Sequence, residues 1–570
     1  MSSLLSLGGR VLAAASLFVA STFSNSHAQS VAAPNWQWAK KLASVSSYVQ
    51  TSATEPATGN TYVGGSFIST TTFGNQTFTA FGIDGFIAKH DVQGNILWAR
   101  QIGGSNSGAR VADMALDASG NIYVVGNLSA STNFSPTFVL NPVSTGSNLY
   151  VVKYDPSGTV LWARCFGAPA NSDGELLGRA VAISPSGLVY IATQLKGQAR
   201  FDAVQLENQL DAGPALIQLS STGNVNWARV ATVQTPRATS LSSDLVYDLG
   251  IDSNESPYFA GSFSGSIRFN SYTLTASANL GSVFLAHYDT QGNLQWATQS
   301  ATSSSGVASL GALVTDAVGN SYLTGTFTND YKSKTGISFG PYPLNSQGGE
   351  DVFVVKYNAT GTPTWARSFG SKNNDRGNAL RLAPNGNILL GGGVAGTTTI
   401  TPELTLVGLN EFDLYAFIIS FTEQGNIQWS NQGKGSSLIN SITTDRAGNL
   451  YVGGQGGYNT VFGNLPSLTI NGYGFIARLS STVLSTHTSR ATQSLALYPS
   501  PTSGAADIQL SALPKGTVLH LSDGLGRVVC QQVVGLEPAH LTLPGLHAGL
   551  YALKATAPNG EYYSGRLLVE

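Results

Sequence analysis

A 14-residue stretch, Phe86–Ala99 (FIAKHDVQGNILWA), returns along the chain and limits more than any other feature how the chain can fold. It contains two short apolar segments around an Asp-x-x-Gly-Asn sequence, which predicts two strands joined by a tight turn. A fixed period is typical of stacked or circular repeats. Related copies recur about every 64 residues and begin at Tyr150, Leu216, Phe284, Phe353 and Phe417.

A second motif alternates with the first and reads as a turn followed by a strand with one buried face. Its copies are Gly59–Gly65, Asp117–Gly126, Gly187–Thr193, Asp252–Gly261, Asp316–Gly325, Asn385–Gly393 and Asp445–Gly454. Seven of the eight tryptophans occupy one position of the repeat: Trp38, Trp98, Trp162, Trp227, Trp296, Trp365 and Trp429. We interpret them as packing residues between adjacent sheets, because a platform for sugars would need exposed rings.

Four strands per repeat, counted seven times, predict an all-β, seven-bladed β-propeller over residues 29–480, because radial repetition leaves only short strand edges. The segment Trp36–Lys40 is a fourth strand without its own first three, and the last repeat lacks a fourth strand after Leu479. We therefore expect the first strand to complete the last blade. Phe-containing pairs such as Phe134-Ser135 and Phe339-Gly340 recur within the repeats and predict an extra hairpin in each.

Strand alternation places the short Asp-x-x-Gly-Asn turns on one face and every long, variable connection on the other. Binding residues concentrate in loops on a rigid scaffold, so the loop-rich face is the predicted site. Its candidate ligand-binding residues are Arg110, Arg237, Asp375 and Arg376. Asp113 and Asp248 belong to the innermost strands, where they could face the central channel.

Composition and motifs argue against several functions. The formal net charge of −2 gives no footprint for nucleic acid. No G-x-S-x-G, H-E-x-x-H, phosphate-loop or EF-hand pattern occurs. We therefore predict no catalytic residue, no cofactor and no metal site, and interpret His90 and His287 as structural. Two cysteines, Cys165 and Cys530, are too few for a disulfide framework.

Several repeat segments resemble the bacterial β-propeller repeats termed SBBP repeats. The matching segments are Phe369-Gly370, Asp375-Arg376-Gly377, Gly386-Asn387-Ile388 and Asp351–Lys356. The resemblance covers about four-fifths of the chain and implies seven blades. It implies no shared reaction, because members of the family have none in common.

The two ends of the chain predict export. Arg10, an apolar run and the small-residue sequence Ser26-His27-Ala28 indicate a signal peptide over residues 1–28. No later stretch is long and apolar enough to span a membrane. Residues 481–494 form a Ser/Thr-rich linker, and residues 495–570 contain short strands that suggest a small antiparallel β-sandwich.

The last segment resembles the type A carboxy-terminal sorting domain of the type IX secretion system of Bacteroidota. The matching stretches are Tyr498–Gly504, Asp523–Val529 and Leu546–Tyr551. The resemblance implies passage to the outer surface by the type IX machinery and its sortase, followed by release or attachment. The predicted sorting-signal residues are Pro499, Pro501, Gly526, Arg527, Gly549 and Tyr551.

These observations predict a secreted or surface-attached, monomeric binding module that recognises a glycan or a surface protein through its loop-rich face. Two alternatives stay open. A polysaccharide-degrading propeller enzyme would gather two or three acids with perturbed pKa values in one pocket. A purely structural surface protein would have no deep pocket.

Overall fold

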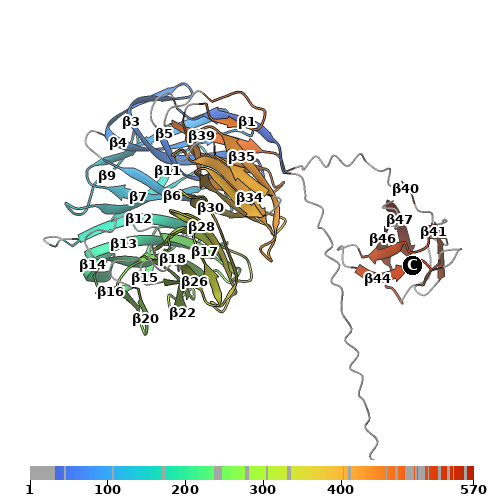
Figure 1. The fold of residues 1–570 in the computed structure, drawn as a ribbon. Coiled ribbons are helices and arrows are strands. Elements are labelled where there is room, and N and C mark those ends of the chain that lie inside the picture. The colour runs from blue at the N-terminus through green and yellow to red at the C-terminus, as the bar shows by residue number, and fades with distance from the viewer. Residues whose placement is uncertain are drawn as a thin grey trace, which may run out of the picture.

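The computed structural model is all-β in the part of the chain that it describes, which confirms the all-β part of the predicted fold class (Figure 1). The described residues are 33–43, 47–104, 108–169, 172, 174–236, 247–276, 281–302, 306–329, 336–401, 404–408, 412–457, 459–468, 473–481, 493–494, 497–498, 507–510, 513–523, 528–535, 540–542, 545–556 and 562–570. The predicted signal peptide, 1–28, and the predicted site residues Arg237, Pro499, Pro501, Gly526 and Arg527 lie outside them.

Seven sheets share one four-strand plan and are numbered I to VII in the order of their first strands. Sheet I contains β2 (Ser47–Thr54), β3 (Thr61–Phe73), β4 (Gln76–His90) and β5 (Ile96–Ile102). Sheet II contains β6 (Arg110–Leu116), β7 (Ile122–Leu128), β10 (Asn148–Tyr154) and β11 (Val160–Phe166). Sheet III contains β12 (Gly174–Ile183), β13 (Val189–Phe201), β14 (Val204–Leu219) and β15 (Val225–Val230). Sheet IV contains β17 (Tyr247–Ile251), β18 (Pro257–Phe263), β21 (Ser282–Tyr288) and β22 (Leu294–Gln299).

The remaining sheets follow the same plan. Sheet V contains β24 (Ala308–Thr315), β25 (Ser321–Phe327), β28 (Asp351–Tyr357) and β29 (Pro363–Phe369). Sheet VI contains β30 (Arg376–Leu382), β31 (Ile388–Val394), β34 (Tyr415–Phe421) and β35 (Ile427–Lys434). Sheet VII contains β36 (Ser437–Thr444), β37 (Leu450–Gly456), β39 (Tyr473–Leu479) and β1 (Trp36–Lys41).

The first strands of these sheets form a closed ring. Each contacts the first strand of the next sheet, in the order β2, β6, β12, β17, β24, β30, β36 and back to β2. Sheet VII joins the two ends of this region, because β1 pairs antiparallel with β39 and the backbone N–H of Ser480 donates to the carbonyl of Asn35 (3.0 Å). Strands that radiate from such a ring form a β-propeller (Figure 1).

Extra hairpins follow the second strand of each of sheets I to VI. The Phe-containing pairs predicted the hairpins of sheets I to V, whereas the hairpin of sheet VI contains no phenylalanine. Separate hairpins are formed by β8 (Thr132–Ser135) with β9 (Phe138–Leu140), β19 (Ser266–Phe269) with β20 (Tyr272–Thr275), β26 (Ile337–Phe339) with β27 (Tyr342–Leu344), and β32 (Thr397–Thr401) with β33 (Leu404–Val407). In sheets I and III the second and third strands are themselves extended into the hairpin. Three short strands link consecutive sheets through hairpin residues: β16 (Thr232–Thr235) pairs with β19, β23 (Ala301–Thr302) with β26, and β38 (Val461–Phe462) with β35.

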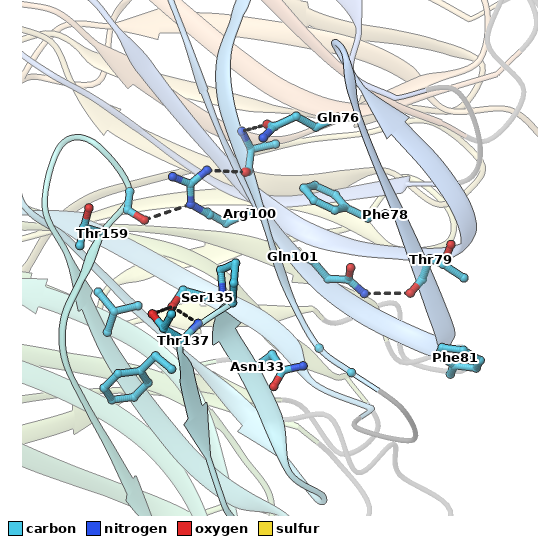
Figure 2. A pocket seen from close by; sticks show the side chains of 17 residues that line it. Gln76, Phe78, Thr79, Phe81, Arg100, Gln101, Asn133, Ser135, Thr137 and Thr159 are labelled. Atoms are coloured by element: carbon cyan, nitrogen blue, oxygen red, sulfur yellow. Dashed lines mark hydrogen bonds between the residues drawn. The ribbon is translucent and has the colours of Figure 1, made fainter.

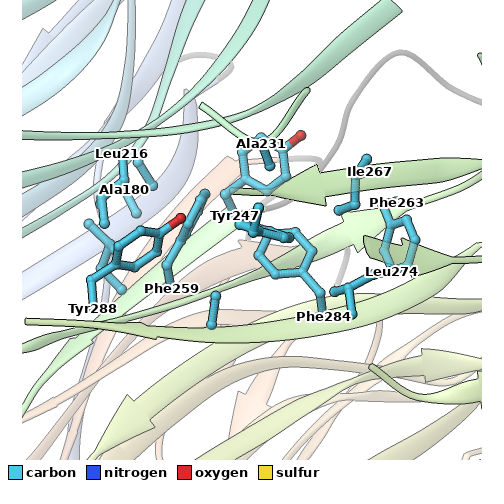
Figure 3. Packing of buried hydrophobic residues seen from close by; sticks show 14 of the residues in the cluster. Ala180, Leu216, Ala231, Tyr247, Phe259, Phe263, Ile267, Leu274, Phe284 and Tyr288 are labelled. Atoms are coloured by element: carbon cyan, nitrogen blue, oxygen red, sulfur yellow. The ribbon is translucent and has the colours of Figure 1, made fainter. Parts of the chain in front are cut away.

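The apolar core lies between consecutive sheets. The cluster between sheets III and IV combines Ala180 and Leu216 of sheet III with Tyr247, Phe259 and Phe284 of sheet IV (Figure 3). Comparable clusters are shared by the other neighbouring pairs. Burial at about 25 cal/mol per Å² of apolar surface therefore stabilises each sheet through its neighbours.

The tryptophans contact the turn of the following sheet, as packing residues between sheets would. Each indole Nε1–H donates to a turn carbonyl in six pairs: Trp38–Val92, Trp98–Pro156, Trp162–Ser221, Trp227–Thr290, Trp296–Ala359 and Trp365–Glu423, at 3.0–3.3 Å. Two residues further along, a glycine with positive φ lies against the same indole: Gly94, Gly158, Gly223, Gly292, Gly361 and Gly425. A Cβ at any of these glycines would lie 2.7–3.1 Å from the ring, so only glycine fits.

The carboxy-terminal strands form two further sheets. The larger contains β40 (Gln493–Ser494), β47 (Tyr562–Val569), β46 (Gly549–Thr556), β43 (Val518–Ser522) and β44 (Val528–Val533), and the smaller β41 (Leu497–Tyr498), β42 (Asp507–Leu510) and β45 (His540–Thr542). Pairing departs from the antiparallel expectation at β40 and β47, which run parallel. Leu519, Leu521, Leu553 and Leu567 are fully buried in a core of their own. No helix among the described residues is long and apolar enough to cross a membrane.

Candidate functional site

A groove of about 780 Å³ lies along the outer edge of sheet I, between its own hairpin and the hairpin of sheet II. Thr79 and Phe81 lie on one side of β5, and Asn133, Ser135 and Thr137 lie on the other (Figure 2). The volume is in the usual range of ligand pockets, roughly 300–1,000 Å³. This groove was not predicted from the sequence, where the hairpin residues were interpreted only as structural.

A smaller side chain in the hairpin of sheet II leaves room for the groove. Sheets IV and V have Tyr272 and Tyr342 three residues after the hairpin phenylalanine, and their hydroxyls donate to the carbonyls of Gln295 (3.4 Å) and Thr364 (2.5 Å) of the fourth strand. Sheet II has Thr137 at this position, which reaches only its neighbour Ser135, with 3.4 Å between the hydroxyl oxygens. The outer edge of sheet II is therefore not covered by a ring.

The polar groups of the groove are fixed by hydrogen bonds. Arg100 donates from Nε to the carbonyl of Gly158 (3.0 Å) and from Nη2 to that of Ser157 (3.2 Å). Gln101 donates from Nε2 to the carbonyl of Thr79 (2.9 Å) and to Oδ2 of the buried Asp84 (2.6 Å). These bonds hold the floor in one arrangement, which lowers the entropy that ordering would cost on binding.

The wall of the groove combines aromatic faces with neutral polar side chains. Phe81 is 62% exposed, while Phe78 and Phe138 are half-buried. Among the described residues that line the groove, Arg100 has the only ionisable side chain. A carboxylate pair, a thiol or an imidazole for covalent or acid–base chemistry is therefore absent from this lining.

The structure does not bring Arg110 and Arg376, two of the predicted ligand-binding residues, together. Arg110 and Arg376 are both exposed and begin β6 and β30, the first strands of sheets II and VI. These sheets are not neighbours in the ring, because β2 and β36 separate β6 from β30 on the shorter side. Arg237 falls outside the described residues.

Asp375 has a role inside the protein and cannot contact a surface ligand. Its buried carboxylate accepts the backbone N–H of Ser371 (2.5 Å) and that of Ala395 (2.7 Å). Burial raises its pKa to about 6. The neighbouring Asp351 accepts the N–H of Gln347 (2.6 Å), and burial together with the charge of Asp375 raises its pKa to about 7. The two buried carboxylates therefore hold backbone N–H groups from inside the protein, whereas the sequence predicted that Asp375 contacts a ligand.

The inner ring also holds two acids with raised pKa values. Burial raises the pKa of Asp113 to about 6, and burial with the charge of Asp113 raises that of Asp248 to about 7. Asp113 accepts the hydroxyl of Thr51 (2.7 Å) and the N–H of Val181 (2.9 Å) in the sheets on either side. Asp248 accepts the N–H of Leu313 (2.7 Å) in sheet V. Both carboxylates therefore connect first strands of neighbouring sheets.

The two histidines that we interpret as structural are buried or half-buried, and so are the two cysteines. His90 is buried, which lowers its pKa to about 4. His287 stacks on Tyr258 with 4.2 Å between ring centroids. Both cysteines are half-buried, neither forms a disulfide within the described residues, and burial raises the pKa of the Cys165 thiol to about 11. The described residues contain no group of three or more His, Cys, Asp or Glu side chains placed to hold a metal ion.

Two of the predicted sorting residues are described. Gly549 begins β46, and Tyr551 is buried in the same strand. The Tyr551 hydroxyl donates to the carbonyl of His547 (2.9 Å), which closes the bend before the strand. Both residues thus have structural contacts within the carboxy-terminal sheets.

Comparison with known proteins supports the fold. Residues 97–134 match the model of the SBBP beta-propeller repeat. An uncharacterized WD repeat-containing protein of Acanthamoeba polyphaga mimivirus is 20% identical over 438 residues, which are 65% of this chain and 31% of that protein. The matched region thus spans about a third of the viral protein.

Similar solved structures include an ulvan lyase bound to a glucuronate–rhamnose sulfate unit, with 11% identity, coverage of 72% of this chain and 92% of that chain, and a TM-score of 0.39. They also include PorZ, a surface component of the type IX secretion system of Porphyromonas gingivalis, with 11% identity, coverage of 93% and 100%, and a TM-score of 0.16. The chain is a β-propeller protein with an SBBP repeat at residues 97–134.

Proposed function

We propose that this chain is an exported, seven-bladed β-propeller that binds a neutral carbohydrate chain in the groove between sheets I and II. The observation that carries this proposal is the lining of the groove. Exposed and half-buried phenylalanines alternate there with amide and hydroxyl side chains, and the one cation, Arg100, donates to backbone carbonyls.

Carbohydrate chemistry fits this lining. A pyranose ring has a C–H face that packs on an aromatic ring and an edge of hydroxyls that exchange hydrogen bonds with amides. Phe81 offers the most accessible face, and Asn133 and Thr137 lie across β5 from it (Figure 2). A charged polysaccharide finds no free counter-charge in the lining, so the preferred ligand is uncharged.

A polysaccharide-degrading enzyme is the second candidate, because Asp113 and Asp248 have raised pKa values and interact electrostatically. Hydrogen bonds argue against this role. Each carboxylate accepts a backbone N–H of another sheet, so an attack on a sugar would require these inter-sheet bonds to break. Binding without turnover is therefore the better-supported function.

The route to the cell surface is part of the proposal. Residues 1–28 would direct export, and residues 495–570, as a small sandwich, would be recognised by the type IX machinery and its sortase in a member of the Bacteroidota. The sorting signal would comprise Pro499, Pro501, Gly526, Arg527, Gly549 and Tyr551. A monomer released or attached at the outer surface would then present the groove to extracellular polymers.

A glycan-binding screen of the full chain tests the function, with product analysis of every ligand that binds. We expect Phe81→Ala to weaken binding of a neutral oligosaccharide at least about ten-fold, because the most exposed aromatic face is lost. Phe412→Ala is the matched control, since Phe412 is 94% exposed and does not line the groove. Unchanged affinity in Phe81→Ala would refute the groove. Loss of affinity in Arg110, Arg237 or Arg376 variants would instead locate the site on the loop-rich face.

A further inference from the structure

A second cavity, of about 400 Å³, lies between sheets VI and VII, where the two ends of the propeller meet. Leu389, Ser420 and Trp429 of sheet VI line one side. Pro34 and Ser481, at the two ends of the propeller chain, line the other. We call this space the seam cavity. It shares no lining residue with the groove between sheets I and II and does not depend on the proposed function.

The seam cavity occupies a position that is filled in the other sheets. One cross-strand row contains Tyr62, Lys89 and Trp98 in sheet I, and Lys89 Nζ and Trp98 Nε1 both donate to the carbonyl of Pro156 in the next turn (3.2 and 3.3 Å). Sheet III repeats this arrangement, because Gln218 Nε2 and Trp227 Nε1 converge on the carbonyl of Thr290 (2.9 and 3.0 Å). Two donors thus meet one carbonyl of a glycine-containing turn.

Sheet VI keeps the tryptophan but loses its surroundings. Its row reads Leu389, Ser420 and Trp429, so an aliphatic side chain replaces the tyrosine and a hydroxymethyl group replaces the long donor. Ser420 is fully buried, and its Oγ has no hydrogen-bond partner among the described residues. Trp429 likewise has none among them, whereas six tryptophans at this position donate to a turn.

The missing group is the turn between the third and fourth strands of sheet VII. The third strand, β39, ends at Leu479, and the fourth, β1, begins at Trp36, so no continuous turn can connect them. Ser481 corresponds to Pro156 of sheet II, and two residues later the sequence has Val483 where the other six turns have glycine.

We propose that the seam cavity binds a glycine-containing β-turn of a partner protein. The turn carbonyl would accept hydrogen bonds from Trp429 Nε1 and Ser420 Oγ, and its glycine would lie on the indole. A buried hydroxyl without a partner is destabilising, and an acceptor in the cavity would offset this cost. The described residues of the lining include no charged side chain, so we expect the cavity to select a ligand by its shape and by one carbonyl group.

The test uses ¹⁵N-indole NMR of the full chain with a cyclic peptide that carries Asp289–Leu294, the turn of sheet IV. This sequence contains glycine and no tryptophan. We expect one of the eight indole resonances, absent in Trp429→Phe, to shift saturably with the peptide. A peptide with valine in place of Gly292 should bind at least about ten-fold more weakly, because its Cβ meets the ring. Ser420→Ala should weaken binding several-fold, and Ser420→Lys should abolish it by filling the cavity.

Three results would overturn the proposal. The first is that the Trp429 resonance does not move with the peptide. The second is that the valine peptide binds as tightly as the glycine peptide. The third is that a neutral oligosaccharide shifts this resonance while the peptide does not. Trp365→Phe is the control for folding and assignment, since the Trp365 indole already donates to the carbonyl of Glu423 (3.0 Å). Because Ser420→Ala leaves every tryptophan in place, the test stands even if Trp429→Phe fails to fold.

Discussion

Sheets II and VI contain the same cross-strand row of three residues, but the space beside this row is filled in sheet II and open in sheet VI. In sheet II, Lys153 lies 4.7 Å from the ring centroid of Tyr123 and 3.1 Å from Asp117, and Trp162 contacts the following turn. In sheet VI, Leu389 and Ser420 stand in place of the tyrosine and the lysine, and a cavity remains. The repeat fills the spaces between its own sheets, and we propose that the cavity left in sheet VI is a binding site.

A methyl group added to a turn glycine should disrupt the contact between this turn and the tryptophan of the preceding sheet. Gly292→Ala would place a Cβ 2.7 Å from the Trp227 indole at a φ of +76°, and we expect a loss of about 3 kcal/mol from backbone strain and overpacking. Gly386→Ala is the matched control, because its φ is +82° and nothing lies within 4 Å of the added Cβ. Urea unfolding midpoints compare the two. Equal losses would show that contact with the indole is unimportant.

Removing the indole sharpens the comparison between filled and open positions. Trp227→Phe loses a buried indole edge and the hydrogen bond to Thr290, and we expect about 2 kcal/mol of destabilisation. Trp429→Phe loses no hydrogen bond within the described residues, and we expect less than about 1 kcal/mol. Thermal unfolding of both variants measures the difference. A larger loss for Trp429→Phe would mean that the seam cavity is already filled by the chain.

Substitutions that introduce the residues of sheet II into sheet VI should fill the seam cavity. The combination Ala383→Asp, Leu389→Tyr and Ser420→Lys would recreate the acid, ring and cation of sheet II. We expect a gain of about 1 kcal/mol, because cavity filling outweighs the modest net value of a partly buried ion pair. Unfolding midpoints provide the measurement, and the turn peptide should no longer bind. Unchanged peptide binding would contradict the inferred position of the site.

The sequence predicts the repeating part of the molecule well. Recurring Asp, Gly and Trp residues were sufficient to infer strands, turns and packing between sheets, because each has a local physical reason at its position. Asp375 was predicted to contact ligand because a loop carboxylate usually faces solvent, and only the fold shows that Ser371 and Ala395 enclose it. Ser420 and Thr137 were missed because each is an unremarkable residue whose meaning depends on larger residues in neighbouring repeats.

A last comparison concerns the first strands, where sheets II and IV have Asp113 and Asp248 and the sheet between them has Ala180. The charge of Asp113 contributes to the raised pKa of Asp248, so Asp113→Asn should lower that pKa from about 7 toward its ordinary value. A carboxyl whose pKa is raised by folding contributes stability below its unfolded pKa, near 3.9, and loses it as pH rises through the folded pKa. The variant should therefore lose its Asp248-linked stability over a lower and narrower pH range than the wild type does. Unfolding midpoints measured from pH 4 to 8 test this, with Asp202→Asn as a control for an exposed acid outside the ring. A profile for Asp113→Asn that differs from the wild type only by the loss of the titration of Asp113 itself would show that the two carboxylates do not interact.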